Sequence, residues 1–134
     1  MNRKNIFIYE DPRNEERVVH KILEQQPNLN IVCIDFTYDP QHPKNIYERF
    51  DDNIYYETEH VKNFLLVLRN RTIHIPVTIL ILDYARHNTT QEQRYLVTRL
   101  CHLSKFLNLH IFICAEGLLD VQPGIRLQSN IHYL

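Results

Sequence analysis

The sequence predicts one three-layer α/β domain over residues 1–134, built on a mainly parallel sheet of about five strands. Two observations lead to this prediction. Apolar runs typical of strands alternate along the chain with segments whose apolar residues recur at helical spacing. The runs are also continuous rather than alternating, as in parallel strands that helices cover on both faces. No second domain, repeat or low-complexity segment is apparent.

The first half of the chain is predicted to hold three strands and two helices. A polar turn at residues 10–14 follows the first strand, and apolar residues at Val18, Ile22 and Leu23 mark the first helix. Pro27 ends that helix. The expected strands are Asn5–Tyr9, Asn30–Phe36 and Asn53–Tyr56, and the expected helices are Arg17–Gln26 and Glu59–Asn70, with a helical turn at Asn45–Phe50.

The second half contains the most apolar run of the chain, Val77–Leu82, which Pro76 opens and Asp83 closes. Thr89 or Thr90 is expected to cap a long helix that ends at about Leu107. Four leucines give this helix one apolar stripe, Leu96, Leu100, Leu103 and Leu107. A strand at Leu109–Ala115, a loop that contains both glycines, and a final strand at Ile131–Leu134 complete the prediction.

Charge and hydropathy exclude several classes of protein. Fifteen basic residues nearly balance sixteen acidic ones, so the formal charge is −1 and the chain is not a globally basic nucleic-acid binder. No apolar run approaches the roughly 20 residues of a membrane span. The basic start leads into only a short apolar run, so neither a secretory signal nor a membrane contact is expected.

Glycine is scarce, with Gly117 and Gly124 where average usage predicts about nine. The first 116 residues therefore contain no glycine-rich phosphate-binding loop. Cys33, Cys101 and Cys114 form no CxxC pair and lie in apolar patterns, which predicts reduced, buried thiols and a cytoplasmic location. The eight histidines form no HExxH motif or tight cluster, so no metal site is expected.

Acidic residues follow the predicted strands. In open parallel sheets, ligands bind beyond the carboxyl ends of the strands. The acids expected at that edge are Glu10 and Asp11 after the first strand, Asp35 after the second, Asp83 after Val77–Leu82 and Glu116 after Leu109–Ala115. An apolar strand that ends in aspartate holds magnesium in phosphate-transfer enzymes. Many buried strands also end in an acid that is simply solvated, and this alternative stays open.

Three segments of the second half carry a resemblance to a known family. They are ILILDYA (Ile79–Ala85), NLHIFICAEGLLD (Asn108–Asp120) and PGIRLQSNIHYL (Pro123–Leu134). In combination they resemble the second half of a genome-packaging ATPase of large DNA viruses, in the FtsK/HerA branch of P-loop ATPases. The resemblance implies a P-loop-ATPase-like sheet in which the first strand lies between Leu109–Ala115 and the last strand. It also suggests a viral source, in the host cytoplasm or the virion.

The same resemblance assigns roles to individual residues. Asp83 falls on the magnesium-holding Walker B position, and Glu116 falls where the family has a polar sensor residue, most often glutamine. Arg126 falls on an arginine that acts at a subunit interface. Because the family works as rings, a homo-oligomer or a contact with an active ATPase is the implied partnership.

The first half departs from the family. On the G-x-x-x-x-G-K-[ST] frame, Glu10 takes the first glycine and Glu15 the second, Glu16 takes the lysine and Arg17 takes the serine or threonine. With Asp11, four carboxylates surround the expected phosphate position, and their charge opposes a triphosphate. The spacing of strand, loop and helix survives, but the groups that bind phosphate are replaced.

The Walker B segment has a second loss. Tyr84 stands where the family has the carboxylate that polarises the attacking water, and tyrosine is a poor general base at neutral pH. Together the two losses predict a degenerate ATPase-like domain without ATP hydrolysis, without a bound cofactor and without catalytic residues. The alternative is a chance match of the frame in some other α/β domain.

Three functions remain as hypotheses. The first is a non-enzymatic protein that acts through protein contacts, with itself, an active ATPase or another partner. The second is a nucleic-acid-binding module derived from a DNA-packaging ATPase. The candidates for contacts with a protein interface or with nucleic acid are Arg86, Arg94, Arg99 and Arg126, and a solvated helix face is the alternative for those on the long helix. The third is a metal-dependent phosphoryl-transfer or phosphodiester enzyme that uses the acidic strand ends, Glu10, Asp11, Asp35 and Asp83.

Overall fold

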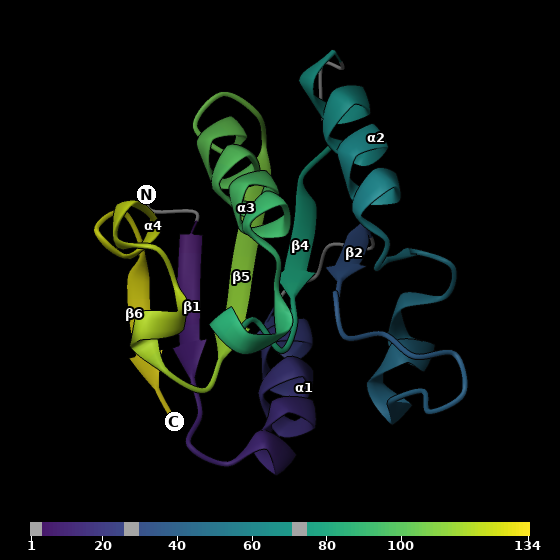
Figure 1. The fold of residues 1–134 in the computed structure, drawn as a ribbon, viewed down its shortest axis with the longest axis vertical. Coiled ribbons are helices and arrows are strands. Elements are labelled where there is room, and N and C mark those ends of the chain that lie inside the picture. The colour runs from purple at the N-terminus through teal and green to yellow at the C-terminus, as the bar shows by residue number, and fades with distance from the viewer. Residues whose placement is uncertain (1–3, 26–29, 71–74) are drawn as a thin grey trace.

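The computed structural model describes residues 4–25, 30–70 and 75–134. Its strands form one sheet with helices on both faces (Figure 1). The strands are β1 (Lys4–Ile8), β2 (Ile31–Ile34), β3 (Ile54–Tyr55), β4 (Val77–Ile81), β5 (Leu109–Ala115) and β6 (Asn130–Tyr133). The helices are α1 (Glu15–Gln25), α2 (Thr58–Arg69), α3 (Gln91–Leu103) and α4 (Pro123–Arg126), with 3-10 turns η1 (Pro12–Asn14), η2 (Asn45–Phe50), η3 (Arg86–Asn88) and η4 (Leu118–Asp120).

The strand order is β3-β2-β4-β5-β1-β6, and each neighbouring pair is parallel. β1 lies between β5 and β6, with Ile6 opposite Ile113 on one side and Ile131 on the other. This is the position that the sequence resemblance implies for the first strand. The predicted α/β class is confirmed. Within the described residues the sheet has six strands rather than about five, because the two-residue β3 pairs with β2.

Both faces of the sheet are buried, which explains the continuous apolar runs. Along β1, Ile6 and Ile8 face one core while Phe7 and the following Tyr9 face the other. The first core holds α2, α3 and α4, and the second holds α1 and η2. A residue on either side of such a strand is removed from water, so an apolar side chain is favoured at each position.

Most strand boundaries, and those of α2, differ from prediction by one or two residues, and three further differences have a physical reason. α1 begins at Glu15, two residues early, since acids are favourable in the first turn of a helix. α3 ends at Leu103, where the Ser104 hydroxyl donates to the Cys101 carbonyl (2.6 Å), although Leu107 still packs on the core. The expected loop near Gly124 contains α4 with proline at its start, a position that lacks a helical hydrogen bond in any case. The predicted end of the first helix at Gln26 lies outside the described residues.

Buried thiols were predicted, and Cys33, Cys101 and Cys114 are free and buried. Burial raises the pKa of Cys101 to about 12, and it raises the pKa of the other two thiols as well. Such thiols stay protonated and inert. Within the part of the chain that the structure describes, no helix is both long enough and apolar enough to cross a bilayer.

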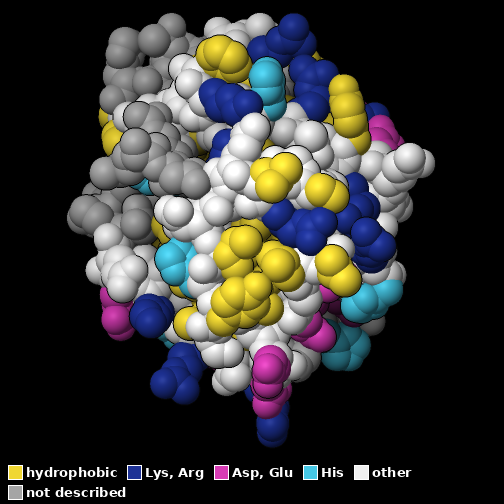
Figure 2. Space-filling view, turned by 90° about the vertical axis from the view of Figure 1, so that its left-hand side faces the viewer, with side chains coloured by type: hydrophobic (Ala, Val, Ile, Leu, Met, Phe, Trp, Pro, Cys, Tyr) yellow, Lys and Arg dark blue, Asp and Glu magenta, His cyan; other side chains and the backbone are white. Residues whose placement is uncertain are grey.

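The β6 edge of the sheet carries exposed apolar side chains. Figure 2 views this side of the molecule and shows hydrophobic side chains gathered among lysines and arginines. The large exposed residues of β6 and the segments near it are Leu119, Leu127, Ile131, Tyr133 and Leu134. An uncovered edge strand with apolar side chains is a surface on which another chain can pair.

Candidate functional site

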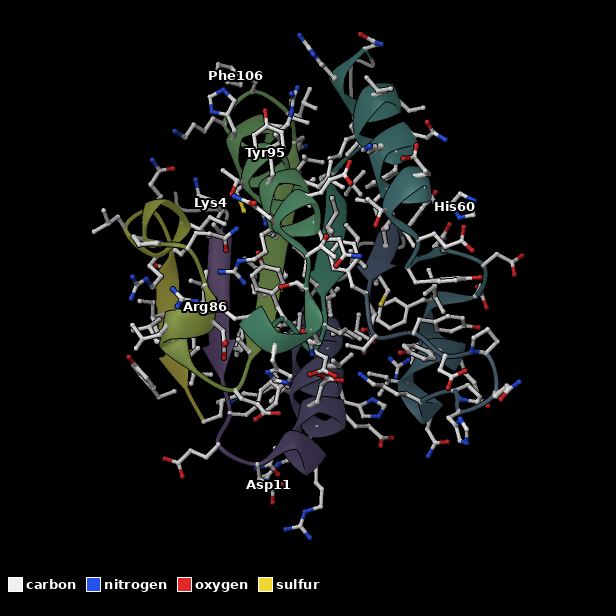
Figure 3. The ribbon with its side chains drawn as sticks, viewed as in Figure 1. Lys4, Asp11, His60, Arg86, Tyr95 and Phe106 are labelled. Atoms are coloured by element: carbon white, nitrogen blue, oxygen red, sulfur yellow. The ribbon has the colours of Figure 1, made fainter. Side chains whose placement is uncertain are left out.

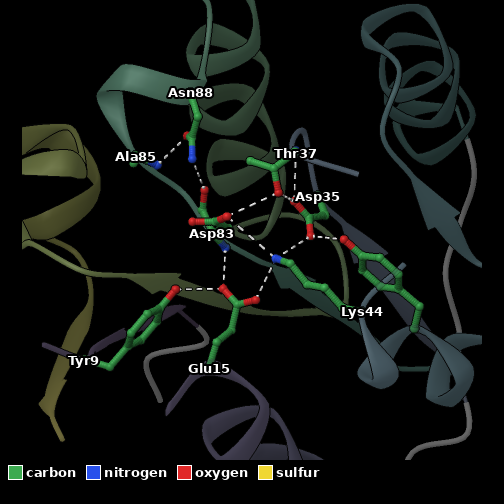
Figure 4. Close-up of polar contacts among 9 residues, drawn as sticks. Tyr9, Glu15, Asp35, Thr37, Lys44, Asp83, Ala85 and Asn88 are labelled. Carbon is green, nitrogen blue, oxygen red and sulfur yellow. Dashed lines mark hydrogen bonds and ion pairs between the residues drawn. The ribbon is translucent and has the colours of Figure 1, made fainter. Parts of the chain in front are cut away.

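Three carboxylates converge on one lysine at the carboxyl ends of the strands (Figure 4). The Lys44 ammonium donates to Glu15 Oε1 (2.8 Å) and to Asp35 Oδ2 (3.1 Å), and it lies 3.7 Å from Asp83 Oδ2. Glu15 begins α1, Asp35 follows β2, and Asp83 follows β4. Because parallel strands end at the same edge of a sheet, residues distant in sequence meet here.

Glu15 contacts three separate parts of the chain. Besides Lys44, its carboxylate accepts the Tyr9 hydroxyl (2.7 Å) and the backbone N–H of Asp83 (2.9 Å), both at Oε2. Burial raises the pKa of the Glu15 carboxyl, while the Lys44 ammonium and the Tyr9 hydroxyl oppose that rise. Burial and the neighbouring Glu15 also raise the pKa of Tyr9, so its hydroxyl remains a donor. The first turn of α1 is thereby tied to the ends of β1 and β4.

Asp35 has no exposed surface, and both of its oxygens are saturated. Oδ2 accepts the Tyr47 hydroxyl (2.6 Å) and the Lys44 ammonium. Oδ1 accepts the backbone N–H (2.9 Å) and the hydroxyl (2.6 Å) of Thr37. A buried carboxylate with this many donors is compensated as a charge and holds the loop after β2 in one conformation.

Lys44 supplies the only cation that these three acids contact within the described residues. Burial by itself lowers the pKa of the Lys44 ammonium, but the carboxylates of Asp35 and Glu15 outweigh it and raise the pKa above its ordinary value. The lysine therefore stays charged at neutral pH. With every carboxylate ionised, the cluster has three negative charges against one positive charge.

Asp83 turns the chain sharply after β4. Its φ of 49° lies in the left-handed region, which aspartate tolerates better than most residues. This conformation aims its N–H at Glu15, while its carbonyl accepts from Asn88 Nδ2 (3.1 Å). The side-chain Oδ1 of Asn88 in turn accepts the Ala85 N–H (3.1 Å), so the backbone after Asp83 is fixed.

A hollow of about 390 Å³ opens beside the cluster. Its lining combines the cluster with residues of both flanking turns, namely Tyr9, Arg13, Glu15, Glu16, Pro43, Lys44, Asn45, Ile46 and Asp83. The hollow is large enough for a small ligand. Glu15 and Lys44 already satisfy each other at its wall, so a phosphate entering here would have to compete with an existing ion pair.

Of the residues predicted around the phosphate position, the structure brings Glu15 and Asp83 together and places Glu16 at the hollow. Glu10 and Arg17 are exposed and do not line it. Asp11 pairs with the exposed Arg13 (2.7 Å), and Figure 3 shows it at the outer end of the turn that leads to α1. The remaining two, Tyr84 and Glu116, lie after β4 and β5.

Tyr84 points away from the cluster. It is buried, its hydroxyl donates to Gln122 Oε1 (2.8 Å), and the Arg94 guanidinium lies 5.3 Å from its ring centre. Burial raises its pKa to about 12, so it supplies no base at neutral pH. Glu116 is exposed after β5. Tyr84 is therefore not positioned beside the Asp83 carboxylate as the second acid of a Walker B segment would be.

We expect Tyr84→Phe to lower the free energy of unfolding by about 1 kcal/mol, because it leaves Gln122 Oε1 without its buried donor. Urea unfolding followed by circular dichroism measures this loss. A change in nucleotide affinity with no change in stability would contradict the purely structural role.

The four arginines predicted to contact a protein interface or nucleic acid come from three elements, η3, α3 and α4. Arg94 and Arg99 are five positions apart, which turns them through about 140° around α3. Arg94 packs against Tyr84, whereas Arg99 lies over Tyr95 on the side of α2. Arg86 is exposed in η3, and Arg126 is half-buried in α4. Arg94 and Arg99 therefore face different sides of α3.

The acids of the third hypothesis are also only partly assembled. Asp35 and Asp83 approach the same Thr37 hydroxyl, at 2.6 and 3.2 Å. Glu10 and Asp11 do not join them. Among the residues that the structure describes, no group of three or more histidine, cysteine, aspartate or glutamate side chains is arranged to hold a metal ion.

Sequence reasoning missed Lys44, Tyr9 and Tyr47 as members of the cluster. Lys44 follows Asp39-Pro40-Gln41-His42-Pro43, a segment interpreted only as a loop. The available signal was its position, since the loop after the second strand starts at the same edge as the other acids. A tyrosine at the end of a buried strand also needs a partner for its hydroxyl, which pointed to Tyr9.

This chain is similar to known proteins in structure, but it matches none of them in sequence. No protein-family model and no curated protein matches the sequence. The fold is similar to that of the cytoplasmic domain of EssC. The two structures have a TM-score of 0.55 and 17% sequence identity over 85% of this chain.

The match covers 27% of that EssC chain, so this chain spans about a quarter of its solved neighbour. At this level of identity the likeness concerns the fold. It supports the ATPase-like α/β architecture that the sequence resemblance implied. Roles for individual residues have to come from the geometry of this chain.

Proposed function

We propose that this chain is a catalytically inactive, ATPase-like module that acts through protein contacts. The fold supports an ATPase-like ancestry, and the contents of the site support the loss of activity. A viral source and a role beside an active packaging ATPase belong to the same proposal and rest on the sequence resemblance. The three reduced, buried cysteines suit an intracellular location, in the host cytoplasm or in the virion.

One observation carries the proposal: the Glu15 carboxylate is locked among Tyr9, Lys44 and the Asp83 N–H. On the P-loop frame, this residue stands at a glycine whose backbone closes around phosphates. A carboxylate there is itself an anion bound to nearby donors. It satisfies the backbone N–H of Asp83 and the lysine ammonium, which are the kinds of group that a phosphate would otherwise recruit.

Electrostatics acts in the same direction. The cluster has an excess of negative charge, and a triphosphate brings about four more negative charges. At an effective dielectric of about 20, each such pair at 4 Å costs about 4 kcal/mol. Lys44 alone offsets one charge, and it is already engaged with three carboxylates.

The exposed apolar side chains of this molecule support a role in protein contacts. Apolar side chains are exposed at the β6 edge and between α2 and α3. Exposed apolar patches of this kind are typical of interaction sites in folded domains.

The test is phosphate release from Mg-ATP by the full chain at high protein concentration. We expect a rate equal to that of Asp83→Asn, a variant that tolerates the left-handed backbone and removes the Walker B charge. Turnover by the native chain that this variant abolishes would overturn the assignment as an inactive module.

A further inference from the structure

α2 and α3 lie side by side on one face of the sheet and run in the same direction (Figure 1). Between them is a groove of about 300 Å³. α2 contributes Lys62, Leu65, Leu66 and Arg69, and α3 contributes Glu92, Tyr95, Leu96, Arg99 and Leu103. At 1.5 Å per residue these positions span about 10–16 Å, or two to three turns of a helix.

The groove has an apolar floor and apolar walls. Leu65 and Leu96 form the buried floor, with 6% and 5% of their surface exposed. Leu66 and Tyr95 form the walls and are 53% and 58% exposed. Figure 3 shows Tyr95 on the outward side of α3. Such a channel accepts a row of apolar side chains from another helix.

Charge is distributed unevenly along the groove. Near the start of both helices, the Lys62 ammonium pairs with Glu59 (3.2 Å) and with Glu92 and is thus compensated. Near the other end lie Arg69 and Arg99, and none of the ion pairs within the described residues includes either of them. That end of the groove therefore has two positive charges available for a partner.

Helix stability explains the position of only one of these two arginines. Arg69 lies in the last turn of α2, where a cation is favourable. Arg99 lies inside α3, and its guanidinium is 5.9 Å from the ring centre of Tyr95, which holds it at the rim of the groove. A carboxylate on an incoming helix would meet positive charge at this end of the groove, which both arginines line.

We propose that this groove binds an amphipathic helix of a partner protein, with apolar side chains along one face and carboxylates near one end. The inference rests on the proposed function. It specifies which surface of this protein-binding module contacts a partner and which kind of partner that surface binds. The groove between two helices fits a third helix, and its apolar floor favours leucine-like side chains on that helix. Arg69 and Arg99 favour acidic over basic residues near one end of the partner.

A display library of helical peptides about 16 residues long, selected against the full chain, tests this proposal. We expect enriched peptides with apolar residues at i, i+3 or i+4, and i+7, and with aspartate or glutamate at one end. Synthetic copies, measured by fluorescence anisotropy, should lose at least about tenfold in affinity for Leu66→Ser and for the double variant Arg69→Glu/Arg99→Glu. Lysine-exchanged peptides should bind the double variant better than the native chain.

Two matched controls separate the groove from general effects. Val67→Ser changes a neighbouring residue of α2 that is 56% exposed but does not line the groove. Lys21→Glu/Arg49→Glu makes the same change in net charge on the opposite layer, at exposed positions in α1 and η2. Both should leave peptide affinity within about twofold of the native value. Circular dichroism verifies that each variant is folded.

Several results would overturn the proposal. One is the absence of any enriched peptide, and another is a set of enriched peptides that are basic or indifferent to the groove variants. Binding of a DNA duplex that Arg69→Glu/Arg99→Glu abolishes would assign the surface to nucleic acid. Self-association that Leu66→Ser abolishes would assign it to a second copy. If the chain binds the acidic peptides and also hydrolyses ATP, the proposal for the groove holds and the proposed function as an inactive module is refuted.

Discussion

Lys44→Met is expected to lower the free energy of unfolding by roughly 2–4 kcal/mol at neutral pH, because it leaves the carboxylates of Glu15 and Asp35 without their cation. This expected loss is smaller than is typical when a fully buried ion pair is broken, because 32% of the Lys44 side chain is exposed to solvent. Urea unfolding, with the midpoint and slope fitted separately, measures the loss.

The deficit of Lys44→Met should shrink on acidification. Burial raises the pKa of Glu15 above its ordinary 4.5, so the folded state holds a proton that the unfolded state releases between the two pKa values. Stability from this group therefore rises as pH falls through the raised pKa, and the gain is complete below 4.5. Removing Lys44 raises the pKa of Glu15 further, so the variant gains more stability than the native chain on acidification. The difference in free energy of unfolding between the two proteins therefore becomes smaller toward about pH 5.

Lys62→Met is the matched control for this prediction. Lys62 also pairs with two carboxylates, Glu59 and Glu92, but on the surface. Exposed pairs contribute little, so its loss should be a small fraction of that for Lys44. Equal losses in the two variants, or a deficit in Lys44→Met that grows on acidification, would contradict the role given to the buried cluster.

Asp35→Asn is expected to destabilise the fold by about 3–5 kcal/mol, although the side chain keeps its shape. Each carboxylate oxygen of Asp35 accepts two hydrogen bonds. Oδ1 accepts the backbone N–H and the hydroxyl of Thr37, and Oδ2 accepts from Tyr47 and Lys44. Whichever way the amide turns, its NH₂ group faces two donors. The variant also leaves Lys44 with one fewer buried counter-charge.

Urea unfolding of Asp35→Asn beside Asp39→Asn provides the comparison. Asp39 accepts from Gln41 and pairs with His42 in the same loop, but it is exposed. Its substitution should therefore cost far less than that of Asp35. A native-like midpoint for Asp35→Asn would show that the loop after β2 does not depend on the carboxylate.

The alternation of elements and the parallel sheet were predictable because burial on both faces leaves a direct mark on sequence. Continuous runs such as Leu109–Ala115 are typical of a strand that helices cover on both sides. The meeting of Glu15 with Asp83 was predictable for a related reason, since the first helix and the fourth strand of such a sheet share an edge.

Other parts of the site left no periodic mark. Lys44 reaches the cluster through a loop whose path depends on its contacts with Asp35 and Glu15, not on a repeating pattern. Tyr84 is buried directly after Asp83, whose backbone is in the left-handed conformation. Neither the loop path nor that single dihedral angle can be read from residue types.

Titration calorimetry of the native chain with Mg-ATP is the most direct test of the central claim, that the first turn of α1 presents the Glu15 carboxylate where a triphosphate would bind. The account predicts no heat of binding up to millimolar nucleotide, with Asp83→Asn indistinguishable from the native chain. Saturable binding in the micromolar range that Asp83→Asn abolishes would contradict it.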